Sequence, residues 1–133
     1  MGNLGTIIRS SVAFGADAII LYGDSVDIYN PKCVRASVGN LWKLPVIHLK
    51  EFKELEETFK DFERIATLPR STNLLKTFKP KFPCLIMFGS EANGLSEDLI
   101  NFSTTSVKIE MKNTVESLNL ASSASIILYE LFV

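Results

Sequence analysis

The stretch FPCLIMFGSEANGLSEDLINF, residues 82–102, determines the kind of fold that this chain can adopt. Its first part, 83–88, is a short and nearly continuous apolar run, as expected of a strand buried on both faces of a parallel sheet. A polar turn bounded by Gly89 and Gly94 follows. Ser96 then begins a helix, because its hydroxyl can accept from free backbone N–H groups and two acids follow it. This order of elements predicts an α/β fold.

Apolar runs alternate with helical patterns on both sides of this stretch. Strands are expected at 18–22, 45–49, 83–88 and 106–111, the last being less buried because its residues alternate. Helices are expected from a cap at Asn3 to Gly15, over 51–66, from Ser96, and from about Asn113 to the C-terminus. The sequence therefore predicts a parallel sheet flanked by helices.

The last of these helices is apolar almost all round. From Ile126 to Val133 only Glu130 interrupts the apolar residues. A helix that is apolar on every side has to be covered on every side, by its own core or by another subunit. We therefore expect a homodimer that uses this helix.

Composition places the chain among small globular domains. It has 133 residues, a formal net charge of −1, 47% hydrophobic residues and 22% charged residues, so one domain with a real core is expected and disorder is not. No apolar run approaches the ~20 residues that span a bilayer, and no secretory signal is recognisable. Two cysteines, Cys33 and Cys84, fit a reducing, intracellular (cytoplasmic) setting. With one histidine, His48, expected to be buried and structural, no metal site is expected.

Charge is distributed unevenly along the chain. Residues 51–63 carry six acids and two lysines, whereas 64–81 carry five basic residues and no acid. A basic stretch can hold phosphate groups, although the overall pI near 5.8 is not that of a strong autonomous nucleic-acid binder. The alternative is a solvated loop, and the sequence leaves both interpretations open.

Three segments could carry chemistry, and none contains a familiar nucleotide-binding or hydrolase motif. The chain lacks G-x-G-x-x-G, the P-loop pattern and G-x-S-x-G. The segments are 3–17, 88–96 and 109–121, of which the second and third join the end of a strand to a helix. Ligands of open α/β sheets bind beyond the carboxyl ends of the strands. Taken singly, the polar residues of these segments could equally be helix caps and surface ion-pair partners.

Taken together, the segments resemble the SpoU family, the ribose 2′-O-methyltransferase branch of the SPOUT superfamily. The resemblance rests on four stretches in family order: NLGTIIRSSVAFG (3–15), SVDIYNPKCVRASVGNLWKLPV (25–46), FGSEANGLS (88–96) and IEMKNTVESLNLASSASIILYE (109–130). It implies an α/β fold with a C-terminal trefoil knot, an obligate homodimer, and S-adenosylmethionine as the methyl donor, which leaves as S-adenosylhomocysteine. The implied substrate is a ribose 2′-hydroxyl of tRNA or rRNA, without a metal ion or a membrane.

The resemblance also implies roles for individual residues. Arg9 matches the first-motif arginine that is proposed to act at the 2′-hydroxyl. A guanidinium holds its proton too tightly to serve as a base, so Arg9 would instead hold a phosphate or the developing alkoxide. The other catalytic positions implied are Asn3, Glu91, Ser117 and Asn119. The implied cofactor positions are Phe88, Gly89, Ser90, Gly94, Ile109, Met111, Leu118 and again Asn119.

Two departures from the family pattern leave alternatives open. Residues 1–133 are interpreted as a single catalytic domain that lacks the family's first strand and an N-terminal RNA-binding domain. Glu110 stands where the family usually has proline, so its carboxylate could weaken adenosine binding or point to solvent. The alternatives to an active enzyme are an inactive or truncated domain that binds RNA or a protein partner, and a module that binds S-adenosylmethionine without methyl transfer.

Overall fold

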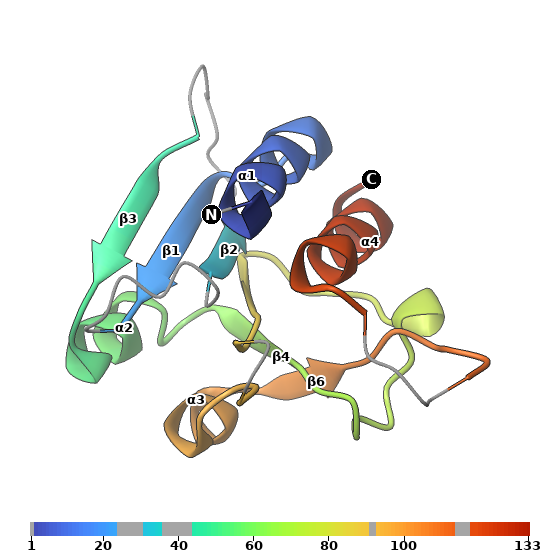
Figure 1. The fold of residues 1–133 in the computed structure, drawn as a ribbon. Coiled ribbons are helices and arrows are strands. Elements are labelled where there is room, and N and C mark those ends of the chain that lie inside the picture. The colour runs from blue at the N-terminus through green and yellow to red at the C-terminus, as the bar shows by residue number, and fades with distance from the viewer. Residues whose placement is uncertain (1, 24–30, 36–43, 91–92, 114–117) are drawn as a thin grey trace.

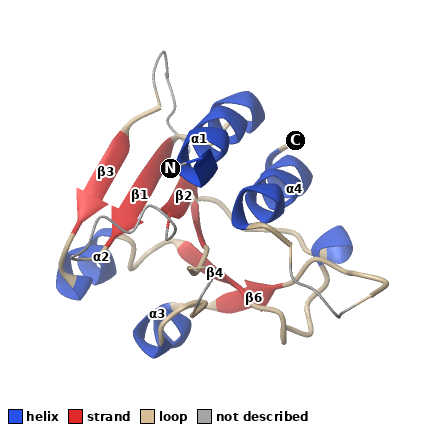
Figure 2. Cartoon of the chain, viewed as in Figure 1, coloured by secondary structure: helices blue, strands red, loops and turns tan. Residues whose placement is uncertain are grey.

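The chain forms a six-stranded sheet with helices on both faces (Figure 1, Figure 2). The computed structural model describes residues 2–23, 31–35, 44–90, 93–113 and 118–133. In chain order the elements are α1 (Gly2–Phe14), β1 (Ala18–Tyr22), β2 (Pro31–Arg35), β3 (Val46–Leu49), α2 (Phe52–Thr58), β4 (Glu63–Thr67), the 3-10 helix η1 (Leu75–Thr77), β5 (Cys84–Met87), α3 (Glu97–Phe102), β6 (Thr105–Val107) and α4 (Leu120–Phe132). The predicted α/β class is confirmed.

The sheet is mixed, with the strand order β3-β1-β2-β5-β4-β6. β3 runs parallel to β1, and β5, β4 and β6 form a second parallel group. β2 is antiparallel to both β1 and β5, so the prediction of a purely parallel sheet is wrong at this strand. The sequence PKCVR of β2 gave no strand signal, because it opens with proline and lacks an apolar alternation.

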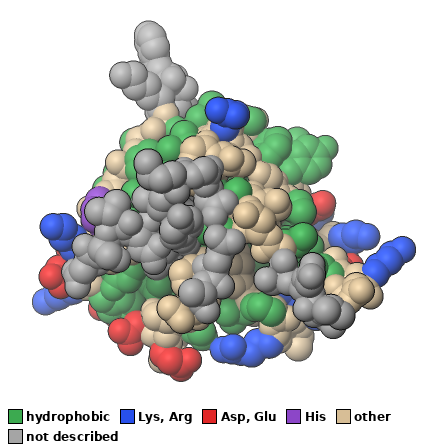
Figure 3. Space-filling view, in the orientation of Figure 1, with side chains coloured by type: hydrophobic (Ala, Val, Ile, Leu, Met, Phe, Trp, Pro, Cys, Tyr) green, Lys and Arg blue, Asp and Glu red, His purple; other side chains and the backbone are tan. Residues whose placement is uncertain are grey.

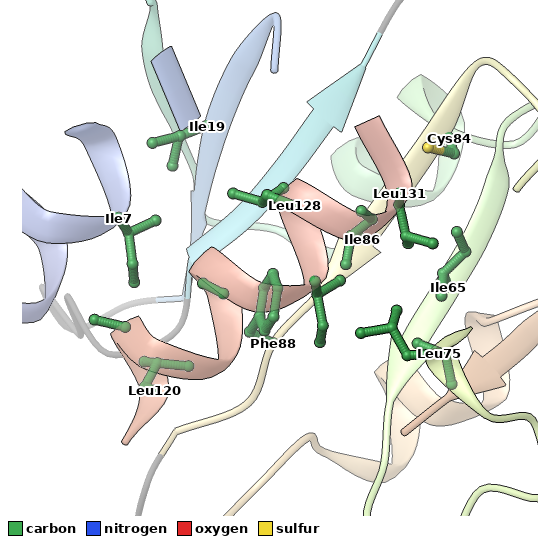
Figure 4. Close-up of a cluster of buried hydrophobic side chains, with 14 residues drawn as sticks. Ile7, Ile19, Ile65, Leu75, Cys84, Ile86, Phe88, Leu120, Leu128 and Leu131 are labelled. Carbon is green, nitrogen blue, oxygen red and sulfur yellow. The ribbon is translucent and has the colours of Figure 1, made fainter. Parts of the chain in front are cut away.

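Two hydrophobic clusters cover the two faces of the sheet. β5 contributes to both: Ile86, together with Phe88 just after the strand, packs on the side of α1 and α4, whereas Leu85 and Met87 pack on the side of α2 and α3. Figure 4 shows the first cluster, in which α4 lies against the sheet and its Leu120 and Leu128 approach Ile7 of α1 and Ile19 of β1. The continuous apolar run of β5 is thus explained by burial on both faces.

Burial on both faces was wrongly expected for the run at 45–49. Its strand, β3, lies at the edge of the sheet with β1 as its neighbour, and Val46 and Ile47 are exposed. His48 is exposed as well, and its Nε2 lies 2.8 Å from the carbonyl oxygen of Gly23. An apolar run indicates a strand but does not say whether the strand is central or at an edge.

The predicted helix over 51–66 ends eight residues early, and β4 takes its place. Arg64 accounts for the break, because its guanidinium donates to the carbonyl oxygens of Phe59, Lys60 and Phe62 at 3.2, 2.7 and 3.2 Å. Its Nε donates to the carbonyl of Phe102 at 2.6 Å, and its Cζ lies 4.3 Å from the centre of the Phe102 ring. These contacts satisfy carbonyls left free where α2 ends.

The other helix boundaries follow the expected residues more closely. α1 begins at Gly2, so Asn3 lies in its first turn instead of capping it, and the helix stops before Gly15, whose φ is +90°. Ser96 caps α3 as predicted, accepting from the backbone N–H of Leu99 at 3.4 Å. The last helix begins at Leu120 and not near Asn113, since Asn119 provides its cap.

The chain's own core covers only part of α4. Leu120, Ala121, Ala124, Ile127, Leu128 and Leu131 are buried. Ile126, Tyr129 and Val133 are exposed. One side of this helix therefore packs against the chain's own core, which is one of the two ways of burying it that the sequence allowed.

Candidate functional site

The candidate site lies where three parallel strands end side by side. β4, β5 and β6 point the same way, so their carboxyl ends meet at one edge of the sheet. The hydroxyl of Thr67, the last residue of β4, donates to the carbonyl of Met87, the last residue of β5, at 2.9 Å. The backbone N–H of Leu68 donates to the carbonyl of Val107 at 3.0 Å. Hydrogen bonds therefore hold the three strand ends in register.

A tight turn follows β5 and requires glycine at Gly89. A Cβ atom there would lie 2.1 Å from the carbonyl carbon of Gly94 and 2.3 Å from the nitrogen of Leu95. Ser90 and Gly94 form an antiparallel bridge, in which the N–H of Gly94 donates to the carbonyl of Ser90 at 2.9 Å. Gly94 has φ +68°, in the left-handed region that favours glycine. Both glycines thus allow the two ends of the turn to lie close together.

The structure describes Phe88 and Ser90, two further candidate residues around this turn, but not Glu91. Phe88 was assigned to the cofactor site, but its side chain is 1% exposed and packs in the core with Leu120, so only its backbone can face a ligand. Glu91 lies outside the described residues. Ser90 uses its hydroxyl to accept from the backbone N–H of Asn93 at 3.1 Å, which closes the turn further.

The segment after β6 offers apolar surface beside these strand ends. Ile109 is half-buried against the core, whereas Met111 and Leu118 are each 40% exposed. Glu110 is exposed, as in the second of its two alternatives, a carboxylate that points to solvent. Large apolar side chains left open at a strand end are suited to contact with a planar, weakly polar group such as a nucleoside base.

Asn119 occupies the start of α4. Its side-chain oxygen accepts from the backbone N–H groups of Ala121 and Ser122 at 2.8 and 3.3 Å. This capping role was not predicted for Asn119, and it fixes the amide of Asn119 at the helix terminus. Ser117 lies outside the described residues.

Arg9 lies on α1, the helix packed beside α4. Its side chain is exposed, and the next residue, Ser10, has its hydroxyl 2.6 Å from that of Ser125 in α4. α1 is therefore held directly against the helix that Asn119 caps. Asn3 lies in the first turn of α1, and its side chain is not among those described.

Sequence reasoning missed the polar residues that support the strand ends. The amide of Asn73 donates to the carbonyl of Ser106 at 2.9 Å, and the hydroxyl oxygens of Ser71 and Ser106 lie 2.8 Å apart. Ser71 is buried, so it acts as an internal tie. A run of small polar residues soon after a strand end was the available signal. Among the described residues, no helix is long and apolar enough to cross a membrane, and no three potential metal ligands gather.

The chain is similar to known sequences over nearly its whole length. The model of the SpoU rRNA Methylase family matches residues 1–129. An uncharacterized tRNA/rRNA methyltransferase of Synechocystis sp. is 39% identical over 131 residues, which are 97% of this chain and 48% of that relative. A 23S rRNA (uridine(2479)-2'-O)-methyltransferase of Streptomyces viridochromogenes is 35% identical, over 97% of this chain and 47% of its own length.

Solved structures share the fold. The SpoU methyltransferase AviRb from Streptomyces viridochromogenes, in complex with the cofactor AdoMet, gives a TM-score of 0.81 at 29% identity, over 97% of this chain and 51% of that one. An AdoMet-bound rRNA methyltransferase from Sinorhizobium meliloti gives 0.78 at 27% identity, over 97% and 50%. The chain spans about half the length of the curated relatives that it matches. Because the family model covers nearly every residue, including all three candidate segments, the chain belongs to the SpoU rRNA Methylase family.

Proposed function

We propose that this chain is the catalytic domain of an S-adenosylmethionine-dependent RNA ribose 2′-O-methyltransferase. The observation that carries the proposal is the edge of the sheet where β4, β5 and β6 end: the Gly89–Leu95 turn follows β5, and the segment after β6 leads to the cap of α4. Relatives named as 23S rRNA 2'-O-methyltransferases match the chain over these same segments.

The residues at the strand ends fit S-adenosylmethionine. Its adenosine needs apolar contact and backbone hydrogen bonds, and Ile109, Met111 and Leu118 supply the apolar surface. The backbone of Phe88, Gly89 and the turn that follows supplies the polar groups. AdoMet is the cofactor bound in two solved structures that share this fold. When bound, it supplies an activated methyl group.

The chain's own part in the reaction is to position and to stabilise charge. The guanidinium of Arg9 is a planar cation with several N–H donors, so it serves to hold a phosphate or the oxygen that loses its proton. Such a fixed donor stabilises negative charge as it develops in the transition state. Asn119 is already committed to α4 through its oxygen, and its remaining amide N–H groups are available for positioning. Asn3, Glu91 and Ser117 complete the proposed catalytic set.

We also propose a homodimer and a trefoil knot at the C-terminus. The homodimer is supported by exposed apolar side chains on α4 and α1, of which Tyr129 is 55% exposed and Val12 is 60% exposed. A second copy would bury this surface, as the apolar C-terminal helix requires. The knot is supported by the TM-score of 0.81 to a SpoU methyltransferase. We propose residues 1–133 as one catalytic unit, with rRNA or tRNA as its substrate.

A methyl-transfer assay tests the proposal. The purified chain is incubated with S-adenosylmethionine labelled on its methyl group and with unmodified rRNA, and the RNA is then digested to nucleosides. We expect label in a 2′-O-methyl nucleoside, and its loss in Arg9→Ala. Cofactor binding without any transfer, by a folded dimer and across rRNA and tRNA, would favour the binding module over the enzyme.

A further inference from the structure

The loop between β4 and β5 carries several positive charges to which the proposed mechanism assigns no role. Residues 68–81 contain Arg70, Lys76, Lys79 and Lys81 and no acid, and all four side chains are exposed. Arg64, which belongs to the same basic stretch of sequence, is different, because backbone carbonyls and the ring of Phe102 occupy its guanidinium. The structure thus separates a structural arginine from four solvent-facing cations.

This loop is tied directly to the segment that carries the candidate site. The N–H of Lys108 donates to the carbonyl of Asn73, and the N–H of Leu75 donates to the carbonyl of Lys108, both at 2.9 Å. Lys108 and the exposed Lys112 therefore join the four cations of the loop. We name these six residues the basic surface: Arg70, Lys76, Lys79, Lys81, Lys108 and Lys112.

Two acids border the basic surface: the carboxylate of Glu63 accepts from the backbone N–H of Lys81 at 2.7 Å, and Glu110 is exposed between Lys108 and Lys112. Other acids lie elsewhere. α2 exposes Glu54, Glu56 and Glu57, and α3 exposes Glu97 and Asp98, both helices covering the opposite face of the sheet from α4. In Figure 3, Lys and Arg side chains project on the right of the molecule, where Figure 1 places η1 and the segment after β6, and others lie at the left and lower edges together with Asp and Glu side chains. A net charge of −1 thus conceals an uneven distribution of charge, and a polyanion is attracted more to the basic surface than to α2 and α3.

We propose that the basic surface binds the phosphates of the RNA substrate and so delivers the target ribose to the strand-end site beside it. The inference rests on the proposed function, because it takes RNA as the substrate. Lys108 and Ile109 are consecutive, so a phosphate held at Lys108 lies within a few residues of Ile109 and Met111, which belong to the proposed cofactor site. Contacts of this kind position RNA without reading its sequence.

The test compares two double variants in the full chain. Lys76→Ala with Lys79→Ala removes two charges from the basic surface, and Lys53→Ala with Lys60→Ala removes two exposed lysines in and next to α2 as the matched control. Binding of a fluorescein-labelled, 20-nucleotide mixed-sequence single-stranded RNA is followed by anisotropy between 50 and 300 mM salt. Thermal melting confirms that each variant is folded.

We expect the first variant to lower the slope of log affinity against log salt by about 1.4 and to weaken binding about tenfold near 0.15 M salt, because each phosphate contact to a single strand contributes about 0.7 to that slope. The control should stay within about twofold of the unchanged chain. Equal effects of the two variants would overturn the assignment and indicate general attraction only. Undetectable RNA binding by the unchanged chain at 50 mM salt would overturn it too.

A calorimetric titration of S-adenosylmethionine separates this inference from the proposed function. The affinity for the cofactor should be the same in both variants and in the unchanged chain. If the cofactor binds and methyl transfer proceeds, but Lys76→Ala with Lys79→Ala leaves RNA affinity unchanged, the function stands and the basic surface is wrong. A change in sedimentation of that variant with unchanged RNA affinity would instead assign the surface to contact between copies, which also overturns the proposal.

Discussion

Replacing Gly89 with alanine places a methyl group where the backbone of Gly94 and Leu95 already lies. The added carbon would be 2.1 Å from the carbonyl carbon of Gly94. The two segments must separate by about 1.3 Å before carbon atoms reach an ordinary contact near 3.4 Å. No flexible side chain can yield, because the obstructing atoms are backbone. The turn that follows β5 therefore has to open.

The cost follows from the contacts that opening breaks. Forcing a methyl group into a packed position costs about 1–3 kcal/mol, and losing the 2.9 Å hydrogen bond between Gly94 and Ser90 costs about 1 kcal/mol more. We expect Gly89→Ala to lower the free energy of unfolding by about 2–4 kcal/mol, which lowers Tm by about 10 °C in a domain of this size. Affinity for S-adenosylmethionine should fall at least about tenfold, since the backbone around Gly89 is part of the proposed site.

Thermal melting and calorimetric titration measure the two effects. Gly5→Ala is the matched control, because a Cβ at Gly5 meets nothing within 4 Å and Gly5 lies inside α1. That variant should gain about 0.5–1 kcal/mol from the better helix propensity of alanine. If Gly89→Ala melts with the unchanged chain and binds the cofactor equally well, the close approach in this turn does not exist and the reasoning fails.

Four further substitutions probe the site, the fold and the dimer. Arg9→Ala should abolish methyl transfer and leave cofactor affinity unchanged by calorimetry, and equal loss of both in a folded variant would contradict a role at the ribose. Arg64→Met should lower Tm by about 10 °C, because about 3 kcal/mol of hydrogen bonding and ring stacking is lost and carbonyls are left without a donor. Asn119→Ser should keep its helix cap and Tm yet lose methyl transfer, whereas unchanged activity would reduce Asn119 to a cap. Tyr129→Asp should yield monomer in sedimentation, and a stable dimer would refute the proposed interface on α4.

The choice of Tyr129 shows what the structure adds to the apolar pattern of the last helix. From sequence, Leu128 is as good a probe of a dimer interface as its neighbours. In the structure Leu128 is 0% exposed and packs between α1 and the sheet, so its replacement would unfold the chain and say nothing about association. The apolar pattern of the last helix predicted that all its sides are buried. Only the packed structure shows which side lies in the chain's own core and which side is left for a partner.

Local sequence signals predicted those elements whose boundaries depend on residues close together in the sequence. The run at β5, the cap at Ser96 and the glycine after α1 each mark a boundary through chemistry that operates within a few residues. The break between α2 and β4 depends on Arg64 reaching Phe102, 38 residues away, and no local pattern contains that contact. The edge position of β3 and the antiparallel direction of β2 are likewise set by which strands become neighbours.

The candidate site was predicted by combining segments that are uninformative alone. Residues that follow parallel strand ends must meet at one edge of the sheet, and Phe88, Ile109 and Leu120, one from each of three such stretches, belong to one hydrophobic cluster. Side-chain direction was beyond this reasoning, as the buried ring of Phe88 shows. The supporting hydrogen bonds of Thr67 and Asn73 could not be predicted, because they depend on the register between strands.

Calorimetric titration of the cofactor into the unchanged chain tests most directly whether S-adenosylmethionine binds at the strand ends. We predict saturable binding with one site per chain, and no comparable binding by ATP, which shares the adenosine but lacks the methionine portion. A folded chain that binds neither would contradict the assignment of the strand-end cluster as a cofactor site, and equal binding of both would reduce it to a nucleoside site.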